Sequence, residues 1–158
     1  MERNTTTISR EDIARQMDHC HAVAQINAQR PQPPLAFVDT YGCQQNAADG
    51  ERMKGMLSQM GFSFTDSPDE ADLVLFNTCA VREHAEDRVF GNVGALKNQK
   101  RRHPGMIIAL CGCMMEQEHV AERIKKSFPY VNLVFGTHVI HRLPFLLLQT
   151  LTDSKRVF

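Results

Sequence analysis

The chain alternates between short apolar runs and longer segments whose apolar residues recur at helical spacing. The runs at 35–40, 73–76, 106–110 and 131–135 are typical of β-strands, and the stretch 62–65 predicts one more short strand. Two of them, 73–76 and 106–110, are apolar on both faces, which is expected for strands buried between helices in a parallel sheet.

Helices are predicted in the intervening segments. Their ranges are about 9–29, 46–60, 81–102, 116–127 and 138–151, with a single helical turn at 67–70. We expect Ser9 to cap the first helix, Gly61 to end the second, and Pro144 to start or kink the last. The second helix carries an apolar face, which we interpret as core rather than as a metal site; it consists of Met53, Met56, Leu57 and Met60.

Strands that alternate with helices predict an α/β fold. We expect an open, mostly parallel sheet of about five strands with helices on both faces, preceded by an N-terminal helical extension. Prolines interrupt the helical pattern before the first strand. The predicted organisation is therefore an extension and linker at 1–34, a main domain at 35–152, and the start of another linker at 153–158.

Composition narrows the class of protein. With 158 residues, 42% of them apolar and 23% charged, the chain is long enough to bury the core of one globular domain. Basic and acidic residues balance at 18 each, so any contact with nucleic acid must come from a local patch. The sequence contains neither a run of about 18 apolar residues nor a charged-then-apolar leader, and we expect a cytoplasmic protein, a monomer.

One basic patch is visible in the sequence. The last turns of the third predicted helix carry Lys97, Lys100, Arg101 and Arg102. Cations at the carboxyl end of a helix interact favourably with its dipole, and this explanation is favoured because no aromatic residues are interleaved to stack on bases. The alternative is a patch that contacts RNA phosphates.

Three cysteine-containing stretches stand where a predicted strand ends. They are Thr40–Cys43, Asn77–Cys79 and Cys111–Cys113, and Cys43, Cys79 and Cys113 are 36 and 34 residues apart, about one strand-helix unit. The carboxyl ends of parallel strands emerge along one edge of a sheet, so these three thiols are expected to converge there. Each also precedes a predicted helix, whose amino end stabilises a thiolate.

Converging thiolates indicate a soft metal, either zinc or an iron-sulfur cluster. Structural zinc takes four ligands, and Cys111 or a histidine would have to be the fourth. A four-iron cluster on three thiolates instead leaves one iron open, which favours reactivity. We interpret Cys111 as a buried strand residue, and Cys20 and His21 as residues of a helix face outside the site.

The motifs around these cysteines resemble a known family. The sequences Thr40-Tyr-Gly-Cys43-Gln-Gln-Asn46, Asn77-Thr-Cys79-Ala-Val-Arg-Glu83 and Gly112-Cys113-Met-Met-Glu-Gln117 are similar to the three cysteine motifs of the N-terminal domain of radical-SAM methylthiotransferases. The later Val134-Phe-Gly-Thr137 and His141-Arg-Leu-Pro144 are similar to that domain's closing segment. The resemblance spans roughly 35–148 and is greatest to the tRNA-modifying branch.

The resemblance implies a site and a reaction. Cys43, Cys79 and Cys113 would hold an auxiliary 4Fe-4S cluster in the domain at 35–152, and its open iron would carry the sulfur or methylthio group added to C2 of an isopentenyl-modified adenosine beside the tRNA anticodon. A second cluster and S-adenosylmethionine belong to a radical domain, whose Cys-x-x-x-Cys-x-x-Cys motif this sequence lacks. We therefore expect an N-terminal domain of a longer enzyme, inactive alone, whose own radical and RNA-binding domains and tRNA are its partners.

Two other functions remain open from the residues. A zinc-binding structural module would use Cys111 or a histidine as the fourth ligand. A redox-active thiol module would need a resolving pair, and Cys111 with Cys113 is the local candidate.

Overall fold

Five parallel strands form the centre of the fold. The computed structural model describes residues 10–40, 44–78, 85–153 and 156–158, and within them the sheet has the order β2-β1-β3-β4-β5. The strands are β1 (Leu35–Thr40), β2 (Ser63–Phe64), β3 (Leu73–Thr78), β4 (Ile107–Gly112) and β5 (Leu133–Phe135). All four pairings are parallel. The predicted α/β fold is confirmed.

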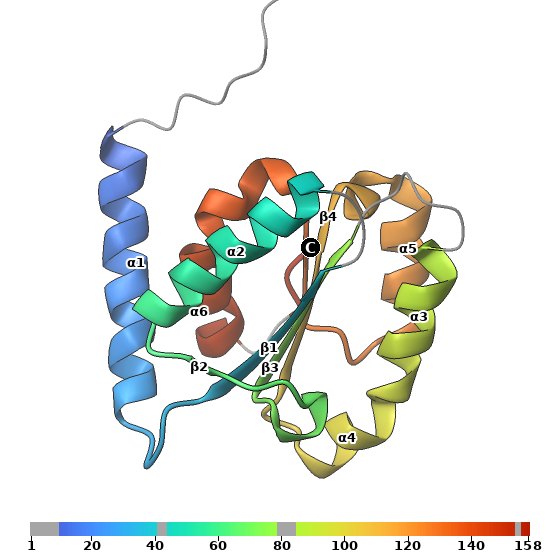
Figure 1. Cartoon of the computed structure of the whole chain (residues 1–158), viewed down its shortest axis with the longest axis horizontal. Coiled ribbons are helices and arrows are strands. Elements are labelled where there is room, and N and C mark those ends of the chain that lie inside the picture. The colour runs from blue at the N-terminus through green and yellow to red at the C-terminus, as the bar shows by residue number, and fades with distance from the viewer. Residues whose placement is uncertain (1–9, 41–43, 79–84, 154–155) are drawn as a thin grey trace, which may run out of the picture.

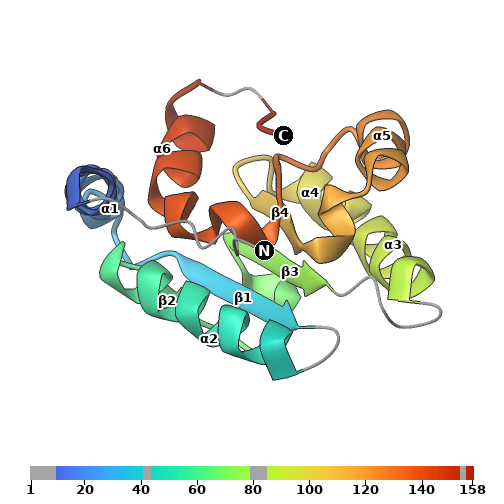
Figure 2. The ribbon, with the colours of Figure 1, turned by 90° about the horizontal axis from the view of Figure 1, so that it is seen from above.

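Helices cover both faces of this sheet. The α-helices are α1 (Arg10–Ala28), α2 (Gln44–Gln59), α3 (Ala85–Ala95), α4 (Lys97–Arg102), α5 (Glu118–Ser127) and α6 (Leu143–Asp153), and the short 3₁₀ helices are η1 (Pro68–Glu70), η2 (Cys113–Glu116) and η3 (Thr137–Arg142). Figure 1 shows α1, α2 and α6 on one face and α3, α4 and α5 on the other, and Figure 2 shows the same division from above. This arrangement follows from right-handed crossovers, which carry the chain over a face of the sheet between parallel strands.

Two apolar cores lie on the two faces, and β3 contributes to both. All six residues of β3 are buried. Val74 and Phe76 belong to the core beneath α3 and α5, whereas Leu73 and Leu75 belong to the core beneath α2 and α6. The methionine-rich face of α2 lies in the second core, where Met53 and Met60 are fully buried. The interpretation of that face as core is confirmed.

Three predicted helices differ in detail. The expected helix at 81–102 is two helices, α3 and α4, that meet at the buried Leu96, and residues 81–84 lie outside the description. Tertiary contacts redirect α4, because the buried Gln99 amide donates to the carbonyl of Pro68 across the fold. The expected helix at 116–127 is α5, separated from η2 by the extended Gln117. The expected helix at 138–151 begins as the 3₁₀ segment η3, and Pro144 stands in the first turn of α6.

The N-terminal extension contributes a helix to this same fold. Ser9, the expected cap, lies outside the described residues, but α1 runs along α6 and α2. The side chain of Asn27 donates to the carbonyl of Met60 at 2.8 Å, and the ring of His19 lies 5.1 Å from that of Phe145. The helix therefore packs on α6 and α2 of the main fold.

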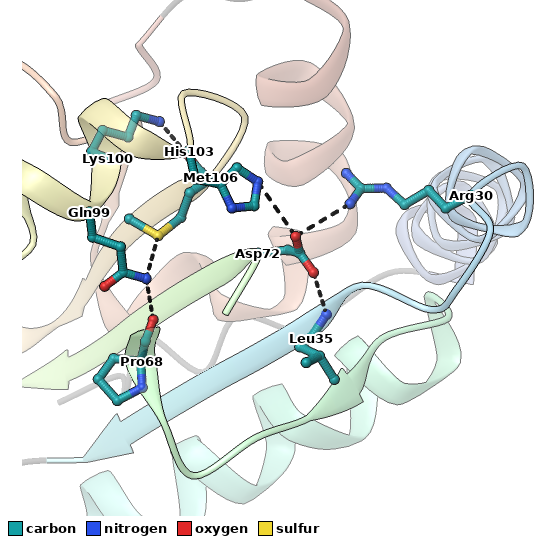
Figure 3. Close-up of polar contacts among 8 residues, drawn as sticks. All are labelled: Arg30, Leu35, Pro68, Asp72, Gln99, Lys100, His103 and Met106. Carbon is teal, nitrogen blue, oxygen red and sulfur yellow. Dashed lines mark hydrogen bonds and ion pairs between the residues drawn. The ribbon is translucent and has the colours of Figure 1, made fainter. Parts of the chain in front are cut away.

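Charged side chains join the amino ends of the strands, as Figure 3 shows. Asp72, just before β3, accepts the backbone N–H of Leu35 at 2.8 Å, and its other carboxylate oxygen lies 3.8 Å from the guanidinium of Arg30 and 3.6 Å from the imidazole of His103. Its backbone also bridges the strands, because its N–H donates to Leu35 and its carbonyl accepts from Ile107. One residue thus connects the starts of β1, β3 and β4.

Candidate metal centre

The carboxyl ends of β1, β3 and β4 lie side by side. Thr40, the last residue of β1, is in register with Asn77 of β3. Thr78, the last residue of β3, is in register with Gly112, the last residue of β4. Neighbouring strands are about 4.8 Å apart, so the three segments that leave these strands start within two strand spacings of one another.

Strand order adds a second argument for this edge. From β1 the chain crosses to β2 on one side, and then returns to β3 on the other side of β1. In open α/β sheets, ligands bind outside the carboxyl ends of the strands at the point where the order reverses. Here that point lies between β1 and β3.

The predicted ligands follow these strand ends directly. Cys79 is the next residue after Thr78, Cys113 is the next residue after Gly112, and Cys43 comes three residues after Thr40. Cys43 and Cys79 lie outside the described residues, and of Cys113 the structure describes the backbone, which opens η2, but not the side chain. The structure therefore places the strand ends that lead into the thiols.

A glycine holds the ends of β3 and β4 in close contact. Gly112 has φ +116°, a conformation that residues with a side chain rarely adopt. A Cβ atom at this position would lie 2.1 Å from the carbonyl oxygen and 2.8 Å from the nitrogen of Thr78. Only glycine lets the two backbones approach in this way, immediately before Cys79 and Cys113. Sequence reasoning missed this residue, although its place between two cysteines was visible.

Buried polar contacts complete the junction below the edge. The hydroxyl of Thr78 donates to the carbonyl of Cys111 at 2.8 Å, and the Cys111 sulfur lies 3.6 Å from both Asn77 Oδ1 and Met53 Sδ. Cys111 is fully buried, and burial, reinforced by the charge of Asp49, raises the pKa of its thiol. It is the buried strand residue that the sequence predicted. A thiol kept protonated inside the core is poorly suited to bind metal.

An acid-base pair at this edge was not identified from the sequence. Glu116, the last residue of η2, has a carboxylate oxygen 2.8 Å from Nδ1 of His138 and 3.3 Å from the hydroxyl of Thr137, which donates to it. A Cβ atom at Gly136 would lie 2.6 Å from Cγ of Glu116. These contacts fasten η2, which begins at Cys113, to the turn after β5. Glu116 and Gly136 both belong to sequence motifs that carry the family resemblance, and this membership was the signal that could have identified them.

Other candidate residues lie elsewhere. Cys20 is half-buried on α1, where burial raises the pKa of its thiol, and His21 is exposed; both line a pocket of about 400 Å³ with Arg52, Met56 and His141. Within the ranges that the structure covers, no three His, Cys, Asp or Glu side chains are grouped as a metal would need.

The basic residues of α4 lie at the opposite end of the sheet. This helix precedes β4, and in Figure 1 it lies away from the arrowheads of the strands. Lys100 donates to the carbonyl of Met106 and, at 3.0 Å, to Oδ1 of Asn132, and burial lowers its pKa. Lys97, Arg101 and Arg102 are exposed. Lys100 thus has a structural role in joining α4 to the sheet.

As for membranes, the helices of the described segments are too short or too polar to span one.

Comparison with known proteins adds to this geometry. Residues 36–136 match the family described as "Uncharacterized protein family UPF0004". The chain is similar to the "tRNA-2-methylthio-N(6)-dimethylallyladenosine synthase" of Clostridium beijerinckii, with 50% identity over 78% of this chain and 27% of the relative. The proteins of the same name from Caldicellulosiruptor saccharolyticus and Acetivibrio thermocellus are 51% and 40% identical, over 76% and 99% of this chain and 26% and 33% of the relatives. The chain thus spans about a quarter to a third of these relatives.

Proposed function

Because the chain belongs to the UPF0004 family, we propose that it is the N-terminal, cluster-holding domain of a tRNA methylthiotransferase. In this proposal Cys43, Cys79 and Cys113 hold one 4Fe-4S cluster, and the domain spans 35–152, preceded by the extension 1–34, whose helix α1 packs on it. The whole enzyme adds a methylthio group to C2 of an isopentenyl-modified adenosine in tRNA, in keeping with the names of its relatives.

One observation carries the proposal: the three strand ends that lead into the cysteines are adjacent at the switch point of the sheet. Cysteine thiolates are the ligands that hold iron-sulfur clusters, and three of them from neighbouring loops would hold a four-iron cluster with one iron left open. Gly112 supports this reading, because its contact with Thr78 brings the chain segments before Cys79 and Cys113 together.

The chain's own residues would hold and orient the group. When bound, a cluster with three protein thiolates supplies an open iron at which sulfur can be presented for transfer to carbon. The buried hydrogen bond between Thr78 and Cys111 holds β3 and β4 together, and the contact of Glu116 with His138 holds η2 in place. The radical chemistry belongs to a domain with its own cysteine motif and S-adenosylmethionine, so this chain alone is proposed to be inactive.

A zinc module is the second candidate. It would need a fourth ligand, and Cys111 is unsuited because its sulfur lies inside the core beside Met53. The same burial argues against Cys111 as the resolving thiol of a redox pair with Cys113.

Anaerobic reconstitution with iron and sulfide tests the proposal. We expect brown absorbance with about four irons and four sulfides per chain. Alanine at Cys43, Cys79 or Cys113 should abolish the cluster, whereas Cys111→Ala and Cys20→Ala should retain it. Stoichiometric zinc without sulfide, or loss of the cluster in Cys111→Ala alone, would contradict the proposal.

A further inference from the structure

A second pocket lies at the same end of the sheet as the predicted cysteine site. It has a volume of about 410 Å³ and is formed where β5 ends, between η2 and α5 on one side and η3 and α6 on the other. Met115 and Glu116 of η2 line it, two and three residues after Cys113. β5 is the next strand after β4, about 4.8 Å away, so this pocket adjoins the segment that carries Cys113.

The pocket combines an apolar interior with a few polar groups. Its apolar walls include Met115, Val134, Phe135, Leu146 and Phe158. Glu116, His138 and Arg142 supply the polar groups. Small-molecule sites are typically 300–1,000 Å³ in volume and mostly apolar, with a small number of polar groups that fix orientation. This pocket has both the size and the composition of such a site.

Exposed apolar surface at the same place supports binding. Phe145 and Phe158 both line the pocket, and both are among the large apolar side chains that the described surface exposes, at 38% and 41%. Exposed aromatic rings beside a concave apolar surface are typical of ligand sites. The cation of Arg156, over the ring of Phe158 at 4.6 Å, holds one of these rings in place.

The chemistry of the substrate matches this arrangement. In adenine, C2 and the carbon that bears N6 are separated by a single ring nitrogen. When an adenine presents C2 to the edge of the sheet that carries the cysteines, its N6 substituent therefore lies only a few bonds from C2, close to the same edge. A dimethylallyl group is branched and wholly apolar, and the N6–H beside it is a donor. Glu116 has acceptor capacity for that donor beyond its contacts with His138 and Thr137, because a carboxylate offers about four lone-pair sites.

We propose that this pocket is the subsite for the N6-dimethylallyl group of the target adenosine, with Glu116 as the acceptor of the N6–H. The inference rests on the proposed function for the identity of the substrate. It assigns the selection of a prenylated adenosine to this chain. The guanidinium of Arg142, at the same pocket, is placed to attract the phosphates that flank the nucleoside.

Binding of nucleosides to the metal-free chain tests the inference separately from the cluster. N6-dimethylallyladenosine and adenosine are titrated into isotope-labelled protein, and the affinities are measured by NMR chemical-shift changes. We expect the prenylated nucleoside to bind at least tenfold more tightly, since each buried methylene contributes a factor of this order in an apolar pocket. The shifts should centre on residues 115–116 and 134–138.

Three variants sharpen this test. Ala121→Leu fills the pocket from α5 without breaking the helix and should remove the preference for the prenylated nucleoside. Ala95→Leu makes the same change in a different pocket, beside Pro68 and Gln99, and should leave the preference unchanged. Glu116→Ala should weaken both nucleosides by a similar factor, because both carry an N6–H.

Several outcomes would overturn the inference. Equal affinities for the two nucleosides would remove the basis for a prenyl subsite. So would shifts centred elsewhere, a loss of preference in Ala95→Leu as large as in Ala121→Leu, or no binding at millimolar nucleoside. A failed reconstitution with iron and sulfide would instead count against the proposed function, since this binding test uses no metal.

Discussion

At the amino end of the sheet one charged side chain helps to join three strands, whereas at the carboxyl end a glycine lets the backbones of two strands pack directly on each other. Asp72 connects the starts of β1, β3 and β4 through a carboxylate that contacts Arg30, His103 and the N–H of Leu35. At Gly112 the backbones of β3 and β4 meet directly, and the hydroxyl of Thr78 also donates to the carbonyl of Cys111. The first arrangement depends on the carboxylate of Asp72, and the second depends on a position where a side chain does not fit.

This difference means that the amino end contributes to the stability of the fold alone, whereas the carboxyl end contributes both to stability and to the predicted metal site. Charged contacts at the amino end can be lost one at a time, and each loss lowers the free energy of unfolding without touching the predicted metal site. At the carboxyl end, the same residue that stabilises the fold also sets the approach of the cysteine-bearing segments. Changes there should affect stability and metal binding together.

The largest effect is expected from Gly112→Ala. The new Cβ would meet the carbonyl oxygen of Thr78 at 2.1 Å in a backbone conformation with φ +116°. Strain at such a position and overpacking each cost about 1–3 kcal/mol, so we expect the free energy of unfolding to fall by roughly 2–6 kcal/mol. Chemical denaturation of the metal-free protein measures it, and reconstitution of the folded fraction should yield less iron per chain.

Gly94→Ala is the matched control. This residue lies inside α3, and among the described residues nothing comes within 4 Å of an added Cβ. Alanine should therefore stabilise the protein by about 0.5–1 kcal/mol. Equal unfolding midpoints for the two variants would refute the close contact of β3 with β4.

A smaller effect is expected at the amino end from Asp72→Ala. The change leaves the N–H of Leu35 without its side-chain acceptor and removes the carboxylate that contacts Arg30 and His103. We expect a loss of about 1–3 kcal/mol in the free energy of unfolding. Iron content after reconstitution should match that of the parent protein. Asp66→Ala removes an exposed carboxylate nearby in sequence and should change the free energy of unfolding little. Reduced iron binding in Asp72→Ala would contradict the proposal that the amino end affects stability without affecting metal binding.

The buried thiol of Cys111 gives a pH dependence at the carboxyl end. Burial raises its pKa above the ordinary value of 9.0, so above that pH the unfolded chain releases a proton that the folded chain keeps. The associated stability is complete below pH 9.0 and declines as the pH rises, by up to about 1.4 kcal/mol per pH unit. Unfolding free energies of the parent and of Cys111→Ala, measured between pH 8 and 10.5, should therefore converge or cross. Cys20→Ala, which removes a thiol that is only half-buried, should show a weaker trend, and parallel curves for parent and Cys111→Ala would contradict this reading.

The smallest effect is expected from the exposed cations of α4. Lys97, Arg101 and Arg102 lie at the end of the sheet opposite the predicted site. Each phosphate contact would contribute about 0.9 to the slope of log affinity against log salt concentration. Replacing the three by glutamine should leave this slope unchanged for a tRNA anticodon stem-loop within the error of measurement. A slope reduced by about one per residue would establish the phosphate-contacting patch instead.

Much of the fold could be predicted because its signals are local. The strand at 35–40 was assigned with the observed bounds, and Gly61, which ends α2, has the positive φ expected of such a residue. Strand order was not predictable, because similar apolar strands can neighbour one another in several ways. The break between α3 and α4 was missed for a related reason: the contact of Gln99 with Pro68 joins residues that are distant in sequence.

The site divides in the same way. The spacing of the cysteines predicted that three strand ends lie together, and the observed register of β1, β3 and β4 agrees with that prediction. The ligand roles of Cys43, Cys79 and Cys113 remain predictions. The requirement for glycine at 112 and the pairing of Glu116 with His138 depend on the approach of separate segments, which no single stretch of sequence records.

The packing of α1 on α6 has a consequence for the order of folding. A hydrogen bond between Gln16 and Phe145 joins residues 129 positions apart, so this contact closes a loop that includes the whole sheet. Closing so long a loop is entropically costly until the sheet between its ends has formed. We therefore expect α1 to dock last during folding and to detach first under mild denaturation. Its amides should exchange with solvent well before those of β3.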